Sequence, residues 1–342
     1  MEEEHKTTQI TSIEADQNID RLNYAYTKED TDYFFASSYN RVEKVLTGQV
    51  YLVTCKEDTL SIQTLTEKYD YGIFSQSLTN EDNGDISLKL GCSDGSFRLY
   101  SFSKESLDLK QEHNICIKDD DMILNHDEGS EHYAFAMDSG NLYVYDKTTL
   151  KESYFHEKAH EYQTWCVLND PVNSDIVYTG ADDAKFKTWD LRLAGDNSTV
   201  MMLNMNRSEY GVTCIQPWLE HQDYVVTGSY DQNLNLWDKR QMKKSVETLN
   251  IGKQIWDIKY HNLGSSSSSA KIGISCVWDG MYFSDVNLDS TLTSLSSLAQ
   301  YNFPNQEILY YAFDFLPTKE EEKQKVLNVA FYKNKIELIQ LD

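Results

Sequence analysis

The sequence is poor in the residues and patterns that mark several large classes of protein. Only four prolines and fifteen glycines occur in 342 residues, which argues against long flexible linkers. The six cysteines are far apart and form no C-x-x-C pair, so we expect reduced, packed thiols rather than disulfides or a zinc site. No run approaches eighteen apolar residues, and the N-terminus lacks the basic and apolar regions of a signal peptide. We therefore expect a cytoplasmic protein with no membrane partner.

Basic residues are also scarce. The chain has 31 Lys and Arg against 55 Asp and Glu, a net charge of −24. Phosphate contacts need clustered Lys and Arg, so we expect no nucleic-acid partner. This charge would suit a basic protein surface, and it would equally serve solubility alone.

Familiar catalytic motifs are missing too. The sequence has no G-x-S-x-G elbow, no Walker loop and no Rossmann glycine pattern. HEKAH at 156–160 matches H-E-x-x-H, but no helical periodicity surrounds it to place both histidines on one face. We therefore expect neither a bound metal nor a cofactor.

What the sequence does contain is a repeat of about 45 residues. TGADDAKFKTWDLR at 179–192 recurs as TGSYDQNLNLWDKR from residue 227, and five weaker copies accompany these two. We take the residue after the turn in each copy as its anchor. The seven anchors are Gly48, Gly95, Gly140, Ala184, Gln232, Gly280 and Asn334, with spacings between 44 and 54 residues.

The positions two and four residues after each anchor carry the signature of strands. Twelve of these fourteen positions are apolar or aromatic, and their neighbours are mostly polar. A repeat of this length with four short strands is typical of a propeller blade. We therefore predict an all-β, seven-bladed β-propeller that forms a single domain over residues 1–342. Because the chain stops after the third strand of the last blade, we expect the segment 1–20, strand-like at Thr7–Ile13, to supply the missing strand.

Aromatic residues recur at one position of the repeat. In propellers of this kind, the turn between the second and third strands lies around the central channel. The residue just before the turn Asp, or its equivalent, is aromatic in four blades, and the starts of the innermost strands add three more aromatics. The seven residues of this aromatic crescent are Tyr39, Trp165, Tyr230, Trp256, Trp278, Tyr311 and Tyr332.

The crescent would face Asp182 and Asp138, an arrangement that suits a quaternary ammonium group held by cation–π contacts. Packing within the blades, or a peptide-binding surface for a protein partner, explains the same aromatics.

The repeats resemble the WD-repeat family. In that family a His upstream of the first strand, the turn Asp and the closing Trp share a hydrogen-bonded network. His160, Asp183 and Trp189 match this pattern in the fourth blade.

The runs 160–192, 211–245 and 255–262 carry a closer resemblance. They look like the WD-repeat enzymes of diphthamide synthesis, the diphthine methyl ester hydrolases, which older usage names diphthine methyltransferases. The residues that match motifs of that family are His160, Trp165, Asp182, Asp183, Gly228, Ser229, Tyr230, Asp231, Trp256, Lys259, His261, Tyr311 and Asp314.

This resemblance implies hydrolysis of the methyl ester of methylated diphthine, a modified histidine of translation elongation factor two that carries a trimethylammonium group. The crescent would hold the ammonium, and Asp182, Glu161 or His160 would activate a water molecule. The alternative is a non-catalytic WD-repeat adaptor, or a methyl-lysine or peptide reader, that binds a protein partner on the same face. In either case we expect a monomer.

Overall fold

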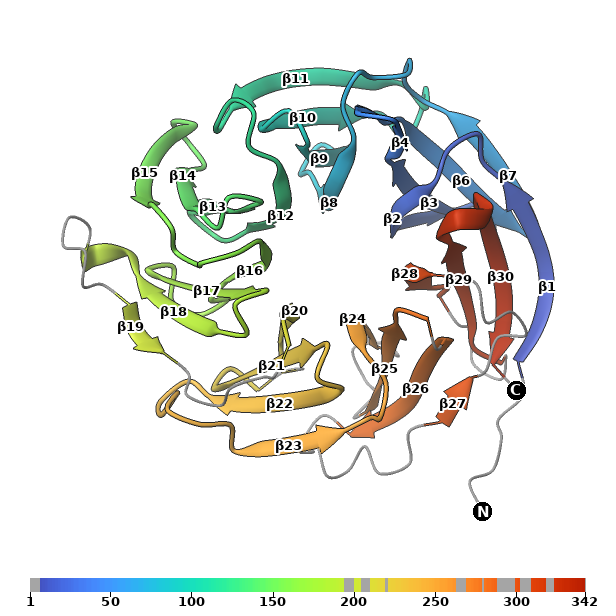
Figure 1. Ribbon diagram of the computed structural model, residues 1–342. Helices are drawn as coiled ribbons and strands as arrows, with labels where there is room; N and C mark the ends of the chain where they lie inside the picture. The colour runs from blue at the N-terminus through green and yellow to red at the C-terminus, as the bar shows by residue number, and fades with distance from the viewer. Residues whose placement is uncertain are drawn as a thin grey trace. The chain divides into compact units, whose positions relative to one another are not determined.

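Over the residues that it describes, the computed structural model contains seven four-stranded sheets and one separate two-stranded hairpin, as Figure 1 shows. The structure describes residues 7–193, 200–203, 210–218, 221–262, 269–278, 280–287, 299–301, 309–317 and 323–341. The predicted all-β, seven-bladed β-propeller is confirmed, since each sheet corresponds to one repeat of the sequence. Within the described ranges, no helix is long and apolar enough to cross a membrane.

Contacts divide the chain into two compact units. The first contains residues 1–123, 277–281 and 299–342, and the second contains residues 124–276 and 282–298. In each unit the core lies between neighbouring sheets, where alternate side chains of the strands pack against each other.

Three blades belong to the first unit. The strands of blade one are β2 (Ile19–Lys28), β3 (Thr31–Ser38), β6 (Val50–Lys56) and β7 (Thr59–Thr64), with the hairpin β4 (Asn40–Val42) and β5 (Val45–Thr47) inserted after β3. Those of blade two are β8 (Ile73–Asn80), β9 (Ile86–Cys92), β10 (Ser96–Phe102) and β11 (Leu109–Cys116). Blade seven contains β28 (Tyr310–Phe315), β29 (Lys325–Ala330), the 3-10 helix η3 (Phe331–Lys333), β30 (Lys335–Leu341) and β1 (Thr7–Glu14).

The strand β1 pairs antiparallel with β30. Thr7 lies opposite Leu341, and Glu14 lies opposite Lys335. The N-terminal segment thereby covers the edge of β30 and completes the four-stranded sheet.

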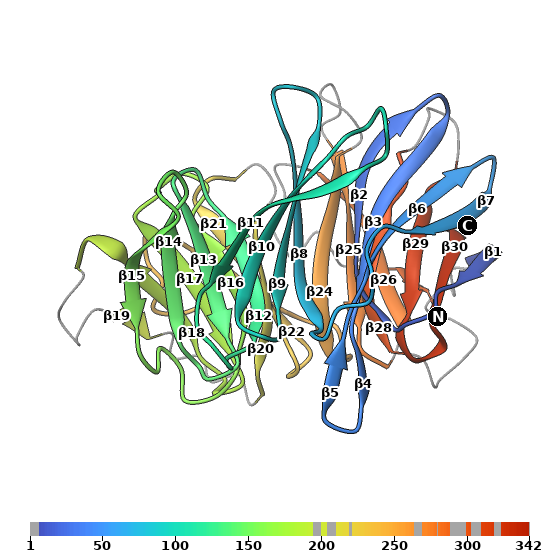
Figure 2. The same ribbon diagram turned by 90° about the horizontal axis from the view of Figure 1, so that it is seen from above.

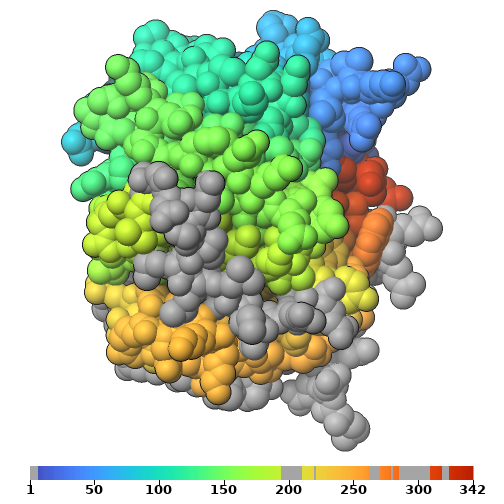
Figure 3. All heavy atoms as spheres, turned by 60° about the vertical axis from the view of Figure 1, so that its left-hand side comes forward, coloured from blue at the N-terminus to red at the C-terminus, as the bar shows by residue number. Residues whose placement is uncertain are grey.

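The other four blades lie wholly or mostly in the second unit. Blade three contains β12 (Ile123–Glu128), β13 (His132–Met137), β14 (Leu142–Asp146) and β15 (Lys151–His156); blade four contains β16 (Thr164–Asn169), β17 (Ile176–Ala181), β18 (Phe186–Asp190), the 3-10 helix η1 (Leu191–Leu193) and β19 (Val200–Leu203). Blade five contains β20 (Val212–Pro217), β21 (Tyr224–Ser229), β22 (Asn233–Asp238) and β23 (Glu247–Asn250); blade six contains β24 (Ile255–Asn262), β25 (Ser269–Cys276), β26 (Gly280–Asn287) and β27 (Ala299–Tyr301). Figure 3 shows blades three and four, in green, as a closely packed surface.

The anchors of the repeat have a conformational basis. Six of them have a positive φ and end the turn between the second and third strands: Gly95, Gly140, Ala184, Gln232, Gly280 and Asn334. Blade one differs, because the hairpin β4–β5 replaces the turn and its left-handed residue is Glu43, at φ 57°. The prediction that Gly48 follows the turn directly was therefore wrong, although Val50 and Leu52 are buried strand residues as expected.

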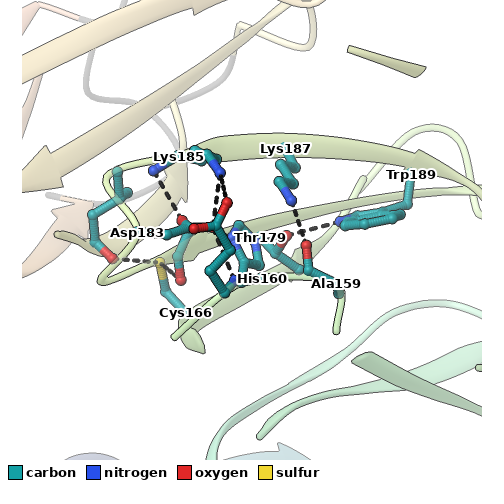
Figure 4. A network of polar contacts seen from close by, with 11 residues as sticks. Ala159, His160, Cys166, Thr179, Asp183, Lys185, Lys187 and Trp189 are labelled. Atoms are coloured by element: carbon teal, nitrogen blue, oxygen red, sulfur yellow. Dashed lines mark hydrogen bonds and ion pairs between the residues drawn. The ribbon is translucent and has the colours of Figure 1, made fainter. Parts of the chain in front are cut away.

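A chain of buried hydrogen bonds connects the His, Thr, Asp and Trp of blade four (Figure 4). The indole N–H of Trp189 donates to Thr179 Oγ1 at 2.8 Å, and Thr179 lies 2.7 Å from Nε2 of His160. Nδ1 of His160 lies 2.9 Å from Asp183. These contacts fit a neutral imidazole that accepts from Thr179 and donates to Asp183. The network thus joins strand β18 to the turn after β17.

The duplicated stretch in blade five repeats part of this network. Trp237 donates to Thr227 Oγ1 at 2.9 Å. In each copy the Asp of the Trp-Asp pair accepts two hydrogen bonds from the Arg two residues later, as Asp238 does from Arg240 at 2.8 and 2.7 Å. The Trp–Thr and Asp–Arg contacts are therefore the same in both copies.

A second repeated feature is a bulge at the start of the innermost strand. In six blades the pairing between the first and second strands skips at this point. The skipped residues are Asp20, Phe74, Trp165, Thr213, Trp256 and Tyr311 with Ala312. A bulge re-aims a side chain out of the regular alternation, so these residues occupy equivalent special positions.

One of these bulge residues is a buried acid. Asp20 is 3% exposed, and its Oδ2 has no hydrogen-bond partner among the described residues. Arg21 lies 3.3 Å from that oxygen, but its Nε donates to the Phe74 carbonyl at 2.7 Å. Burial raises the pKa of Asp20 to about 6, with Arg21 opposing the rise.

Replacing Thr179 by Val is expected to cost more stability than the matched change Thr227→Val. The first leaves two buried groups without a partner, on His160 and Trp189, and the second leaves one, on Trp237. At about 1–3 kcal/mol for each unsatisfied group, the loss for Thr179→Val should be roughly twice the other. Denaturant unfolding of both variants measures this, and equal losses would contradict the network.

Asp20→Asn is expected to stabilise the protein increasingly as the pH rises. The folded state binds the Asp20 proton more tightly than the unfolded chain does, because the pKa of Asp20 is about 6 in the folded state. The folded wild type therefore loses stability relative to its unfolded chain as the pH rises toward and through this value. The advantage of the variant should grow by about 2 kcal/mol between roughly pH 4.5 and pH 8. Unfolding of the wild type and the variant at both pH values tests this, and a difference that stays constant with pH would contradict it.

Candidate functional site

The second unit brings four of the predicted site residues together. Trp165 and Trp256 are the bulge residues of β16 and β24, and Asp182 and Tyr230 begin the turns after β17 and β21. We call these four residues the tryptophan–aspartate cluster. They come from blades four, five and six.

The rings of this cluster are in edge contact. The centroids of Trp165 and Trp256 are 5.6 Å apart, and those of Tyr230 and Trp256 are 6.1 Å apart. The interplanar angles are 60° and 74°, so the rings do not stack. Because all three are only partly buried, ring surface remains accessible beside the contacts.

Asp182 is solvent-exposed at the edge of these rings. Its backbone N–H donates to the Gln163 carbonyl at 3.0 Å, and its Oδ1 lies against Gly211, where a Cβ would approach to 2.5 Å. Gly211 therefore leaves the space that the carboxylate occupies.

Partial burial raises the pKa of Asp182, and the charge of Asp183 adds to the rise. The indole N–H of Trp165 opposes the rise, and its effect is larger than that of the Asp183 charge. Burial also raises the pKa of Tyr230, and the charge of Asp182 contributes. The carboxylate of Asp182 thus interacts electrostatically with Trp165 and with Tyr230.

The other two predicted catalytic residues lie in a different setting. His160 is 1% exposed, both of its ring nitrogens are hydrogen-bonded, and burial lowers the pKa of its imidazole. Glu161 is exposed and forms an ion pair with Lys185. This geometry gives His160 a structural role and shows no contact between Glu161 and the cluster.

The HEKAH stretch does not form a helix. His156 ends β15, and the four residues after it form a turn in which Lys158 has a φ of 50°. Among the described residues, no group of three or more His, Cys, Asp or Glu could hold a metal ion.

The first unit contains a second aromatic group. The ring of Phe331 lies 5.1 Å from each of Tyr39, Tyr311 and Tyr332, and Tyr39 also stacks on Phe74 at 4.4 Å. Burial raises the pKa of Tyr39, and the charge of the nearby Asp20 contributes. Trp278, in the turn after β25, is 48% exposed and has no ring contact with another described residue.

Sequence reasoning missed three residues: Asp20, which is a neighbour of this second group, and two of its members, Phe74 and Phe331. The first two occupy the bulge position, so aligning the starts of all innermost strands would have found them. Phe331 directly follows β29, one residue before the position used to predict the crescent. Six of the seven residues of the predicted crescent thus fall into two aromatic groups, one within each unit, and Trp278 belongs to neither group.

Comparisons with known proteins support the propeller fold. The family described as "WD domain, G-beta repeat" matches residues 199–238. The WD40 β-propeller domain of Doa1 superposes with a TM-score of 0.68 at 13% identity, over 98% of this chain and 97% of that one.

Two relatives share a name. A protein of Dictyostelium discoideum named diphthine methyltransferase homolog is 26% identical over 280 residues, which cover 77% of this chain and 75% of that protein. The human protein named diphthine methyltransferase is 32% identical over 104 residues, 30% of this chain and 22% of its own length. The chain therefore has a seven-bladed β-propeller fold with a WD-repeat match at residues 199–238, and it is similar to proteins named diphthine methyltransferase.

Proposed function

We propose that this chain is an ester hydrolase that removes the methyl ester of methylated diphthine on translation elongation factor two, giving diphthine. The observation that carries the proposal is the tryptophan–aspartate cluster, in which three aromatic rings lie beside one exposed carboxylate. The name of the relatives supports diphthine as the substrate.

The cluster matches the cationic end of this substrate. A trimethylammonium group has no N–H donor, so aromatic faces and a nearby negative charge are what can hold it. Trp gives the strongest cation–π contacts, each worth about 0.5–2 kcal/mol. Trp165, Trp256 and Tyr230 supply the rings in this proposal, and the carboxylate of Asp182 supplies the opposite charge.

Asp182 is also the base that we propose for the ester step. Its raised pKa makes it a better proton acceptor than an ordinary carboxylate. It takes a proton from a water molecule as the water oxygen bonds to the ester carbonyl carbon. The bond from that carbon to the methoxy oxygen then breaks, the proton passes to this oxygen, and methanol leaves. The acid product releases its own proton to solvent, so water is the only co-reactant.

Loss of the Asp182 carboxylate is expected to stop the reaction. Elongation factor two bearing methylated diphthine is incubated with the wild-type chain, with Asp182→Asn, or with the control Asp223→Asn, and the modified peptide is weighed by mass spectrometry. We expect loss of one CH2 unit with the wild type and the control, and a rate at least about 100-fold lower with Asp182→Asn, the range expected for removal of a general base. Asp223 is a matched control because it is an exposed acid of the same unit that pairs with Arg240.

The outcomes separate the alternatives. An intact ester with measurable binding would favour a reader or adaptor over the hydrolase. Neither binding nor turnover would contradict the proposal altogether. Full activity of Asp182→Asn would leave the hydrolase standing and remove Asp182 as its base.

Gly211→Ala is expected to impair turnover without removing any side chain of the cluster. Its methyl group would meet Oδ1 of Asp182 at 2.5 Å and force the carboxylate to move. A displacement of about 1 Å at a reacting group can lower the rate by roughly 100-fold. Gly129→Ala is the matched control, since its methyl group would meet Asn169 at 2.8 Å, outside the cluster. Equal rates for the two variants would argue against this position for the base.

A further inference from the structure

The first unit contains a buried carboxylate whose hydrogen-bonding capacity is not met. Asp20 is 3% exposed, and its Oδ2 accepts no hydrogen bond from a described residue. The Nε atom of Arg21 is 3.3 Å from this oxygen, but it donates to the Phe74 carbonyl. A buried charge without a hydrogen-bond donor costs free energy, so an oxygen of this kind marks a place where a donor can bind.

Aromatic rings flank this carboxylate on both sides. The strand β2 contacts both β8 and β28, and it lies between them in Figure 1 and Figure 2. Asp20, Phe74 and Tyr311 lie at the bulges of these three strands, so they occupy equivalent positions on neighbouring innermost strands. Phe74 and Tyr311 are only partly buried, which leaves ring surface accessible on either side of Asp20.

Tyr39 adds a third ring beside the carboxylate. Its N–H donates to the carbonyl of Asn18, two residues before Asp20, at 3.2 Å, and its ring stacks on Phe74 at 4.4 Å. Burial contributes most to the raised pKa of Tyr39, and the charges of Asp20 and Tyr311 add to the rise. The polar ends of these three side chains are therefore close enough to interact.

This arrangement is the inverse of the tryptophan–aspartate cluster. In that cluster the rings of Trp165 and Trp256 occupy the bulges, and Asp182 begins a turn. In the first unit the acid Asp20 occupies the bulge, and the ring of Tyr39 follows the second strand. Asp182 is exposed to solvent, whereas Asp20 is buried with an open oxygen. A cation without N–H donors cannot satisfy that oxygen, so the two sites suit different cations.

We infer that Asp20 and the rings of Tyr39, Phe74 and Tyr311 form a binding site for a primary ammonium group, as carried by a lysine side chain or a free amine. An N–H of the ammonium donates to Oδ2 of Asp20, and the rings contact the cation by their faces. A compact ammonium suits an acid with so little exposure better than a planar guanidinium does. The inference is independent of the proposed function, because it uses residues of the first unit alone.

The first test titrates n-butylammonium chloride into the full chain by isothermal calorimetry at pH 8, where Asp20 is ionised because its pKa is about 6. We expect a Kd of roughly 1–10 mM for the wild type. Asp20→Asn should bind at least about tenfold more weakly, since it loses the charge that strengthens the hydrogen bond. Asp108→Asn, which changes an exposed acid of the same unit, is the control and should bind like the wild type. Asp20→Asn is expected to be more stable than the wild type at this pH, so its weaker binding would not come from unfolding.

A second cation and a second pair of variants separate the carboxylate from the rings. Tetramethylammonium has no N–H donor, so its binding should not depend on Asp20. Tyr39→Phe keeps the ring and should bind n-butylammonium like the wild type. Tyr39→Leu removes the ring and should weaken the binding by about threefold or more.

Equal affinity of Asp20→Asn and the wild type for n-butylammonium would overturn the inference. So would an equal loss of affinity for both cations in Asp20→Asn, or no binding by the wild type well above the expected Kd. Titration of Nα-acetyl-lysine amide identifies the source of the ammonium. Binding at least as tight as that of n-butylammonium indicates a lysine side chain, and weaker binding indicates a free amine. None of these outcomes bears on ester hydrolysis, so a failure here leaves the proposed function as it stands.

Discussion

The structure depends on holding the turn between the second and third strands of each blade. In blade four a buried chain of hydrogen bonds from Trp189 through Thr179 and His160 ends on Asp183. Asp182 is the residue before Asp183, so the same network fixes the backbone from which its carboxylate extends. A carboxylate on a free loop would lose conformational entropy whenever it met a substrate. In this protein, packing in the core orders the backbone at Asp182 before any ligand binds.

Much of the fold follows from the spacing of the repeat alone. Six of the seven anchors mark positions with a left-handed backbone, and the alternation after each anchor marks a strand. The hairpin β4–β5 was not predicted, because Gly48 satisfies the spacing even though it lies beyond this insertion. Periodicity detects what all the blades share, and an insertion in one blade is invisible to it.

The sequence predicts those site residues whose placement depends on their position in the repeat. It does not predict those whose environment depends on side chains packed around them. Trp165 and Trp256 meet because both occupy the same bulge in blades four and six. The buried state of Asp20 follows from the side chains packed around it, which no local pattern encodes. A buried acid with an unpartnered oxygen destabilises the folded state, and such groups concentrate at functional sites. His160 shows the opposite case, since a residue typical of catalysis here completes a structural network.

The pairing of β1 with β30 bears on how the chain is synthesised. Among the described strands, β1 is made first and β30 last, yet they share one ladder. Contacts so distant in sequence form late, because the entropy of loop closure must be overcome before the ladder stabilises it. During translation the edge of β1 therefore remains unpaired while the intervening blades fold. In that interval a strand from another chain can pair with the exposed edge. Growing chains are therefore more vulnerable to misassembly than finished ones.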